Sequence, residues 1–104
     1  MLKSLATAAV LLLTAAPLAQ AATVTVNITN YMFMPAKITV HPGDKVIWTN
    51  QDSIPHTATS LDGKSFDSGA IDPNASWSTV FTKPGSFKYR CAIHPDMQGE
   101  VDVQ

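Results

Sequence analysis

The segment CAIHPDM, residues 91–97, places a thiol, an imidazole and a thioether close together, with two residues between each pair. Cys91 is the only cysteine in the chain, and His94 is one of three histidines. Thiolate and thioether groups are soft metal ligands, and imidazole suits copper well. Two histidines, one cysteine and a weak axial methionine form a trigonal copper site that transfers one electron. Cys91, His94 and Met97 supply three of these four groups, so a second histidine is required from elsewhere.

The residues on either side of this segment predict two strands that it connects. Phe87, Tyr89 and Cys91 occur at every second position, and alternate side chains of a strand share one face. Residues 99–103 alternate in the same way and place Val101 and Val103 on one face. The segment must therefore turn back sharply, and a loop this short can point its three ligand-type side chains at one centre.

Short alternating segments separated by turn residues continue through the rest of the chain. Further strands are predicted at residues 23–29, 37–41, 45–50, 56–60 and 76–81, with a short edge strand around Phe66. Residues 31–35 are predicted to form a bulky apolar kink between the first two of these strands. No window has sustained helical periodicity. About seven or eight short strands predict an all-β sandwich or barrel with one domain.

His56 is the candidate for the second histidine. It lies at the far side of the loop that follows the strand at 45–50, directly after Pro55, whose ring stiffens the chain. Loops cluster at the ends of a sandwich, so this loop and residues 91–97 are predicted to meet at one end.

Two neighbouring polar residues are predicted to hold this loop. Thr57 is expected to hydrogen-bond across to the Cys91 loop, and Asn50 is expected to act through the loop before His56. His41 precedes a turn at the opposite end of its strand, so it is predicted to be solvated and to lie outside the site.

The first residues are predicted to be a cleaved secretory signal peptide. Lys3 gives a positive start, residues 5–16 are apolar or small, and residues 19–21, Ala-Gln-Ala, fit a small-x-small cleavage site. The alternative, an uncleaved membrane anchor, would need about 20 apolar residues. The predicted organisation is a signal peptide over residues 1–21 and one domain over residues 22–104, exported to a bacterial periplasm.

The charge and cysteine content narrow the classes of function. The formal net charge is −1 with no block of like charge, which argues against nucleic acid as a partner and against a polybasic membrane surface. After signal cleavage we expect no membrane anchor, and we expect a monomer. A single cysteine cannot form an internal disulfide, and a domain of this size is only marginally stable without a disulfide or another cross-link. A bound metal would add to the free energy of folding.

Each candidate ligand also has a simpler interpretation. A lone cysteine is most often a small buried hydrophobic residue, a single methionine fills cores, and a single histidine is usually solvated or hydrogen-bonded. Their joint occurrence at this spacing, in an exported β protein, favours copper. Zinc is the main rival metal, but structural zinc sites usually have four cysteine or histidine ligands, and thioethers are not among zinc's usual ligands.

This pattern resembles a known family. Cys91, His94 and Met97 at this spacing, with the upstream Asn50 and the Pro55–His56 pair, resemble the ligand pattern of the cupredoxins, the small type 1 blue copper proteins. The short spacing on both sides of His94 is most similar to the amicyanin-like members. The resemblance covers nearly the whole expected mature chain.

The resemblance implies an eight-strand Greek-key sandwich that binds one copper ion through His56, Cys91, His94 and Met97. It implies that the protein is not an enzyme and shuttles single electrons between periplasmic redox proteins, such as a dehydrogenase as donor and a c-type cytochrome as acceptor. It also implies that the exposed ligand is His94. An apolar docking patch is then expected around it, formed by Pro95, Pro55, Ile54, Met32 and Met34.

The chain departs from the amicyanin-like pattern at two positions. Asp96 follows Pro95 where amicyanin has an aromatic residue, and Thr57 stands where many cupredoxins have asparagine. The carboxylate makes the expected docking patch less apolar, so the partner does not transfer with the resemblance. Two other functions remain open: a periplasmic protein that binds and delivers copper, and a structural sandwich that binds no metal.

Overall fold

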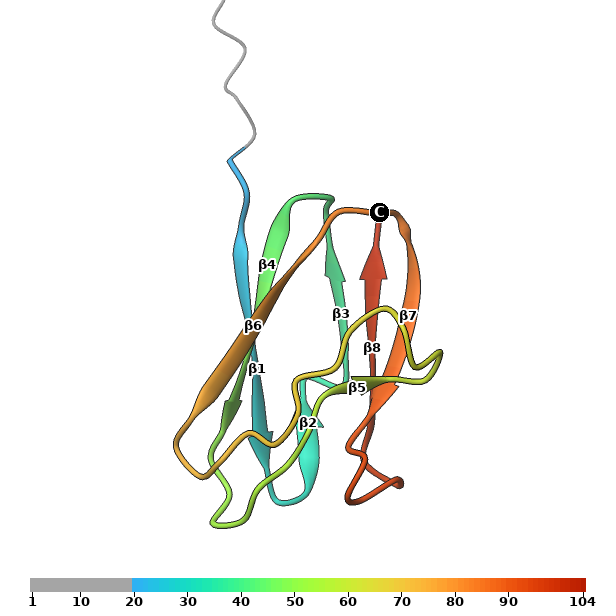
Figure 1. The fold of residues 1–104 in the computed structure, drawn as a ribbon. Coiled ribbons are helices and arrows are strands. Elements are labelled where there is room, and N and C mark those ends of the chain that lie inside the picture. The colour runs from blue at the N-terminus through green and yellow to red at the C-terminus, as the bar shows by residue number, and fades with distance from the viewer. Residues whose placement is uncertain (1–19) are drawn as a thin grey trace, which may run out of the picture.

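The computed structural model describes residues 20–104, which form two four-stranded sheets (Figure 1). The first sheet has the order β2-β1-β4-β6 and the second β3-β8-β7-β5. In chain order the strands are β1 (Thr23–Thr29), β2 (Met32–Met34), β3 (Lys37–Val40), β4 (Asp44–Asn50), β5 (Thr59–Ser60), β6 (Ser76–Phe81), β7 (Gly85–Arg90) and β8 (Gln98–Val103). The predicted eight-strand sandwich is confirmed.

Both sheets contain parallel and antiparallel strand pairs, because the chain passes from the first sheet to the second after β2. β1 pairs with β4 in parallel and with β2 antiparallel, and the chain then enters the second sheet at β3, which pairs with β8 in parallel. The remaining neighbours in both sheets are antiparallel. No helix within residues 20–104 is long and apolar enough to cross a membrane. The predicted signal peptide lies almost wholly outside the described residues.

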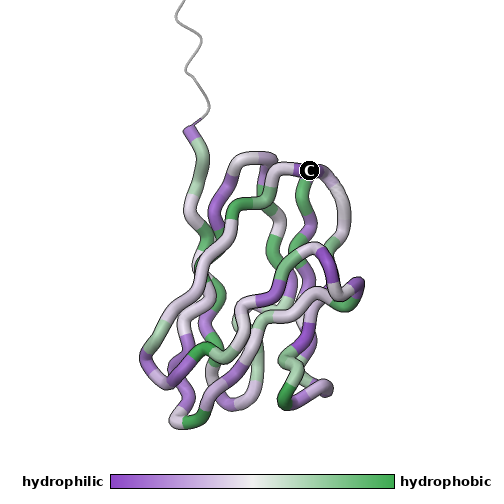
Figure 2. The backbone as a smooth tube through the Cα atoms, in the orientation of Figure 1, coloured by the Kyte–Doolittle hydropathy of each residue, from purple (hydrophilic) through white to green (hydrophobic). Residues whose placement is uncertain are grey.

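The core is formed by buried apolar residues of both sheets. Figure 2 shows hydrophobic and hydrophilic positions interspersed along the strands. Val26 and Ile28 of β1, Trp48 of β4 and Val101 of β8 are fully buried. This is the expected outcome of period-two patterning, since one face of each strand is removed from water. The predicted inward row on β7 is also confirmed: burial increases from Phe87 through Tyr89 to Cys91.

Tyr89 is packed against Gly99, its partner across β7 and β8. A Cβ atom on Gly99 would overlap the phenol ring of Tyr89, so glycine is the residue that this contact requires. Burial raises the pKa of Tyr89 to about 12. The contact fixes the end of β7 two residues before Cys91.

The structure corrects the prediction of a kink at residues 31–35. Asn30 and Tyr31 have φ of 51° and 57° and form a two-residue turn, and β2 then pairs antiparallel with β1. Turns of this kind match the twist of the flanking strands, but they favour asparagine and glycine. Tyr31 carries no such signal, which is why the sequence indicated a kink and not a hairpin.

The predicted strand at 56–60 is shorter in the structure, where β5 contains only Thr59 and Ser60. His56 instead forms an isolated bridge with Ile71, with backbone N···O distances of 3.2 and 2.7 Å. The Ser68 hydroxyl accepts the N–H of Ala58 (2.7 Å), so a side chain there takes the place of a backbone hydrogen bond between strands. The strand expected around Phe66 is likewise reduced to one bridge, between Thr59 and Asp67.

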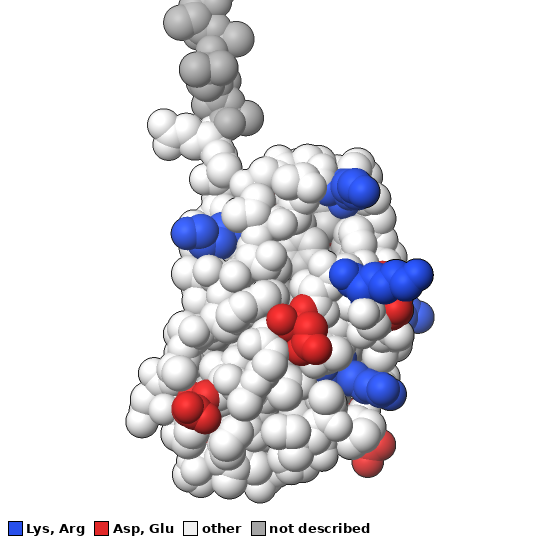
Figure 3. All heavy atoms as spheres, viewed as in Figure 1, with Lys and Arg blue, Asp and Glu red and all other residues white. Residues whose placement is uncertain are grey.

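Three connections gather at the lower end of the sandwich in Figure 1: the β1–β2 turn, the β4–β5 loop and the β7–β8 loop. These connections contain Tyr31, His56 and residues 91–97. On the face shown in Figure 3, this end is mostly uncharged, with acidic side chains at its margins. The predicted meeting of the two ligand-bearing loops at one end is confirmed.

Candidate metal centre

Three ligand-type side chains converge at this end. The Sγ of Cys91 lies 3.7 Å from Nδ1 of His56 and 3.8 Å from Nδ1 of His94. All three atoms lie within 4.8 Å of one another, the one such metal-ligand group found among the described residues. His56 and Cys91 are fully buried, and His94 is half-buried. His41 is exposed beside Asp44 and takes no part, as predicted.

These separations fit a trigonal metal site. Bonds of about 2.05 Å from imidazole nitrogen and about 2.3 Å from thiolate, meeting at about 120°, place nitrogen and sulfur about 3.8 Å apart. A tetrahedral angle with the same bonds would give about 3.6 Å. The observed 3.7 and 3.8 Å lie within this range, so one metal ion could be bound by both nitrogens and the sulfur. One thiolate and two imidazoles are a ligand set that suits copper.

Met97 completes the loop. The N–H of Met97 donates to the carbonyl of His94 (2.9 Å), and the N–H of Cys91 donates to the carbonyl of Met97 (3.0 Å). These two bonds close residues 91–97 into a tight turn, as the spacing predicted. Met97 is 4% exposed and packs with the core at this end.

Thr57 joins the two ligand loops. Its N–H donates to Cys91 Sγ (3.3 Å), and its hydroxyl accepts the N–H of Ala92 (2.7 Å). A hydrogen bond to a thiolate stabilises the charged form of the sulfur and fixes its direction. The expected hydrogen bond from Thr57 to the Cys91 loop is confirmed.

Asn50 organises the loop before His56. Its side-chain nitrogen donates to the carbonyls of Ile54 (2.8 Å) and Ile71 (2.9 Å), and its side-chain oxygen accepts the N–H of Asp52 (2.9 Å). Asn50 is fully buried, and these three bonds use both of its amide hydrogens and one lone pair of its oxygen on loop backbone. It therefore positions His56 through the β4–β5 loop, as predicted, and does not reach residues 91–97.

Asp52 is a functional residue that the sequence did not reveal. Its Oδ2 lies 2.8 Å from Nε2 of His56, so the carboxylate accepts the Nε2 proton and leaves Nδ1 directed at Cys91. Burial would raise the pKa of Asp52, but hydrogen bonds from the Tyr31 N–H, the His56 ring and the Asn30 N–H outweigh it and hold that pKa below its usual value. The sequence does place Asp52 four residues before His56. In a loop, however, a separation of four residues does not predict that two side chains will meet.

Tyr31 was also missed. Its ring meets the ring of His94 edge to face, with centroids 5.1 Å apart and an interplanar angle of 89°. It meets the ring of His56 in the same way, at 5.4 Å and 84°. Nothing in the sequence relates residue 31 to residues 56 and 94, because the contact depends on the β1–β2 turn.

The surface beside His94 differs from the expected patch. A hollow of about 410 Å³ is lined by Tyr31, Ile93, His94, Pro95, Asp96 and Met97. Met32 and Met34 are about half exposed on β2, but neither they nor Ile54 and Pro55 line this hollow. Asp96, which was predicted to make this surface less apolar, does line the hollow, so the surface combines apolar groups with one carboxylate.

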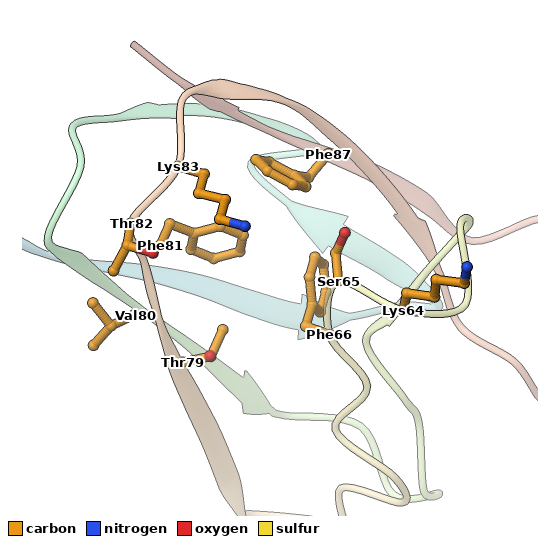
Figure 4. Close-up of a pocket in the computed structure, with 9 residues that line it drawn as sticks. All are labelled: Lys64, Ser65, Phe66, Thr79, Val80, Phe81, Thr82, Lys83 and Phe87. Carbon is orange, nitrogen blue, oxygen red and sulfur yellow. The ribbon is translucent and has the colours of Figure 1, made fainter.

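A second hollow, of about 400 Å³, lies apart from the metal centre (Figure 4). Phe66, Phe81 and Phe87 line it, together with Lys64 and Lys83. It shares no residue with the three converging ligands. It is therefore not part of the metal centre.

The chain is similar to known cupredoxins over most of its length. A family model for the cupredoxin-like domain matches residues 3–103. Amicyanin-alpha of Methylorubrum extorquens is 31% identical over 90 residues, covering 83% of this chain and 76% of its own. A purple cupredoxin structure from Nitrosopumilus maritimus has a TM-score of 0.72 at 30% identity and covers 78% of this chain and 99% of its own. A copper-containing nitrite reductase from Thermus scotoductus has a TM-score of 0.74 at 28% identity over 79% of this chain, but this covers only 22% of the reductase chain.

Proposed function

We propose that this chain, which belongs to the cupredoxin family, is an exported blue copper protein that shuttles single electrons between periplasmic redox partners. At the coarser level, it is a type 1 copper electron-transfer protein, and its cofactor is copper. The observation that carries the proposal is the placement of two imidazole nitrogens 3.7 and 3.8 Å from one cysteine sulfur.

We assign four ligands. His56, Cys91 and His94 supply the trigonal set, because their ligand atoms already face one another. Met97 would supply its thioether as a weak fourth ligand, because it is buried in the same loop and thioethers take that role in such sites. The identity of this weak ligand influences the reduction potential of the copper in such sites.

Copper, when bound, would supply the one-electron chemistry. The residues of the chain fix the orientation of the ligand side chains. Asp52 orients His56, the N–H of Thr57 orients the sulfur of Cys91, and Asn50 holds the loop between the two sheets. Ligands held in this way rearrange little, and a small rearrangement allows fast electron transfer.

Partners are proposed to approach at His94, the half-buried ligand. The hollow beside it contains the apolar side chains of Tyr31, Ile93 and Pro95. A periplasmic dehydrogenase is the proposed donor class and a c-type cytochrome the proposed acceptor class. We propose that the protein is not an enzyme, since four protein ligands leave no open position for a substrate.

Export is proposed to end with cleavage between Ala21 and Ala22. The N–H of Ala22 donates to Asp44 Oδ1 (2.8 Å), and its carbonyl accepts the N–H of Lys45 (2.9 Å), so Ala22 is joined to the sandwich. Asp44 is 5% exposed, and the new α-ammonium group would lie against its carboxylate. The intact mass of protein recovered from the periplasm of an expressing bacterium is expected to match residues 22–104. A recovered mass that still includes residues 1–21 would contradict cleavage.

The alternative function is copper delivery by a protein of the same fold. The rate of electron self-exchange distinguishes an electron carrier from a delivery protein. We expect a reversible one-electron wave and rapid electron exchange between oxidised and reduced copper protein, measured by NMR line broadening in mixtures of the two. The zinc-loaded protein is the redox-silent control. Slow exchange, with copper passing readily to a chelating acceptor, would reject the carrier and favour delivery.

A further inference from the structure

We infer that Tyr31 is a positioning residue for the metal centre, one that holds the ring of His94 in its ligating orientation before metal arrives. The inference rests on the proposed ligand set. It assigns a role to a residue half exposed at the surface, with 52% of its area accessible.

The rings of Tyr31, His56 and His94 form a mutual cluster. Tyr31 lies 5.1 Å from His94 and 5.4 Å from His56, centroid to centroid, and the two histidine rings are 5.2 Å apart. Both tyrosine contacts are nearly perpendicular, at 89° and 84°. Edge-to-face packing at these distances is a favoured arrangement of aromatic rings. One tyrosine ring therefore restricts the rotation of both imidazoles.

The two histidines differ in what else holds them. His56 is fully buried and its Nε2 is held by Asp52 at 2.8 Å. His94 is half-buried, and among residues 20–104 its ring has no carboxylate partner of this kind. A metal-bound histidine normally has a group on its second nitrogen that fixes the ring. At His94 the aromatic contact with Tyr31 takes the place of that group.

The position of Tyr31 is itself fixed by the site. Its φ of 57° lies in the left-handed region, which bulky residues seldom adopt. The Asp52 carboxylate accepts the N–H groups of Asn30 (2.8 Å) and Tyr31 (3.0 Å) and also Nε2 of His56. One carboxylate thus anchors a ligand and the turn that carries the ring. A backbone conformation that costs energy is retained where the surrounding contacts determine it.

A docking role alone would make a different prediction. If Tyr31 only touched redox partners, its removal would change reactions with a partner and leave the isolated protein unaltered. If it positions His94, its removal changes the isolated protein, with and without copper. The measurements that separate the two therefore use the isolated protein.

The test compares Tyr31→Asn, Tyr31→Phe and Met32→Asn with the wild-type chain. Asparagine tolerates the left-handed backbone, so Tyr31→Asn removes the ring and keeps the turn. Tyr31→Phe keeps the ring, and Met32→Asn removes an equally exposed neighbour, Met32 being 49% exposed. The first readout is the NMR line shape of the His94 ring in the metal-free protein. The second is the rate at which a chelator removes copper.

Tyr31→Asn is expected to broaden the His94 signals and to speed copper removal about 2- to 13-fold, the factor that corresponds to the loss of one aromatic pair. Tyr31→Phe and Met32→Asn are expected to match the wild type. Unchanged His94 signals in metal-free Tyr31→Asn would overturn the inference even if copper binds normally. A wild-type protein that binds no copper through Cys91 would instead reject the proposed function, and the NMR comparison would still decide whether Tyr31 orders His94.

Discussion

Replacement of Cys91 by serine is expected to abolish the intense visible band that the wild-type protein develops with Cu(II). The band arises from charge transfer between a thiolate and copper, and Cys91 carries the only thiol in the chain. Serine preserves the size of the side chain and can accept the N–H of Thr57, which now donates to Sγ at 3.3 Å. The loss of colour should therefore be complete while the fold persists, as judged by visible absorption and far-UV circular dichroism.

Ala92→Ser is the matched control for this substitution. It introduces the same hydroxyl one residue away, at an exposed position whose N–H remains bound to Thr57. We expect it to keep the full band. A strong band in folded Cys91→Ser would show that the sulfur of Cys91 is not the source of the colour, and the ligand assignment would be wrong.

Copper is expected to raise the melting temperature by roughly 15–30 °C when free copper is about a thousand times its dissociation constant. The ion would link His56 on the β4–β5 loop to Cys91 and His94 on the β7–β8 loop, so it binds the folded chain and not the unfolded one. Without disulfides, the domain depends on its core and on this link. Thermal unfolding followed by circular dichroism, with and without copper, measures the shift.

The Cys91→Ser protein serves as the control for stabilisation as well. With one ligand removed, copper should raise its melting temperature much less than that of the wild type. An equal shift in both proteins would place the stabilising copper elsewhere on the chain. No shift in the wild type would contradict a site that spans the two loops.

The sequence predicted the convergence of His56, Cys91 and His94 because most of its signals are local. Cys91, His94 and Met97 lie within one loop, and the period-two pattern of Phe87 and Tyr89 already determines the face from which Cys91 leaves β7. Placing His56 required only the general rule that loops of a sandwich meet at its ends.

The residues that the sequence did not reveal act across long separations in the chain. Tyr31 meets the histidines only because Asn30 and Tyr31 adopt left-handed backbone and reverse β1 into β2. Asp52 matters because its carboxylate faces that same turn, 21 and 22 residues earlier in the chain. Asn30 fits the first position of such a turn, but Tyr31 does not fit the second, and neither contact leaves a periodic pattern in the sequence. Propensity indicated a kink at residue 31, and tertiary packing produced a turn.

The visible and EPR spectra of the purified protein after addition of Cu(II) test the central claim most directly. The arrangement of His56, Cys91 and His94 predicts an intense blue thiolate-to-copper band together with narrow copper hyperfine splitting. Both features require copper bonded to the sulfur of Cys91. A pale protein with the wide hyperfine splitting of ordinary cupric complexes would contradict the type 1 site.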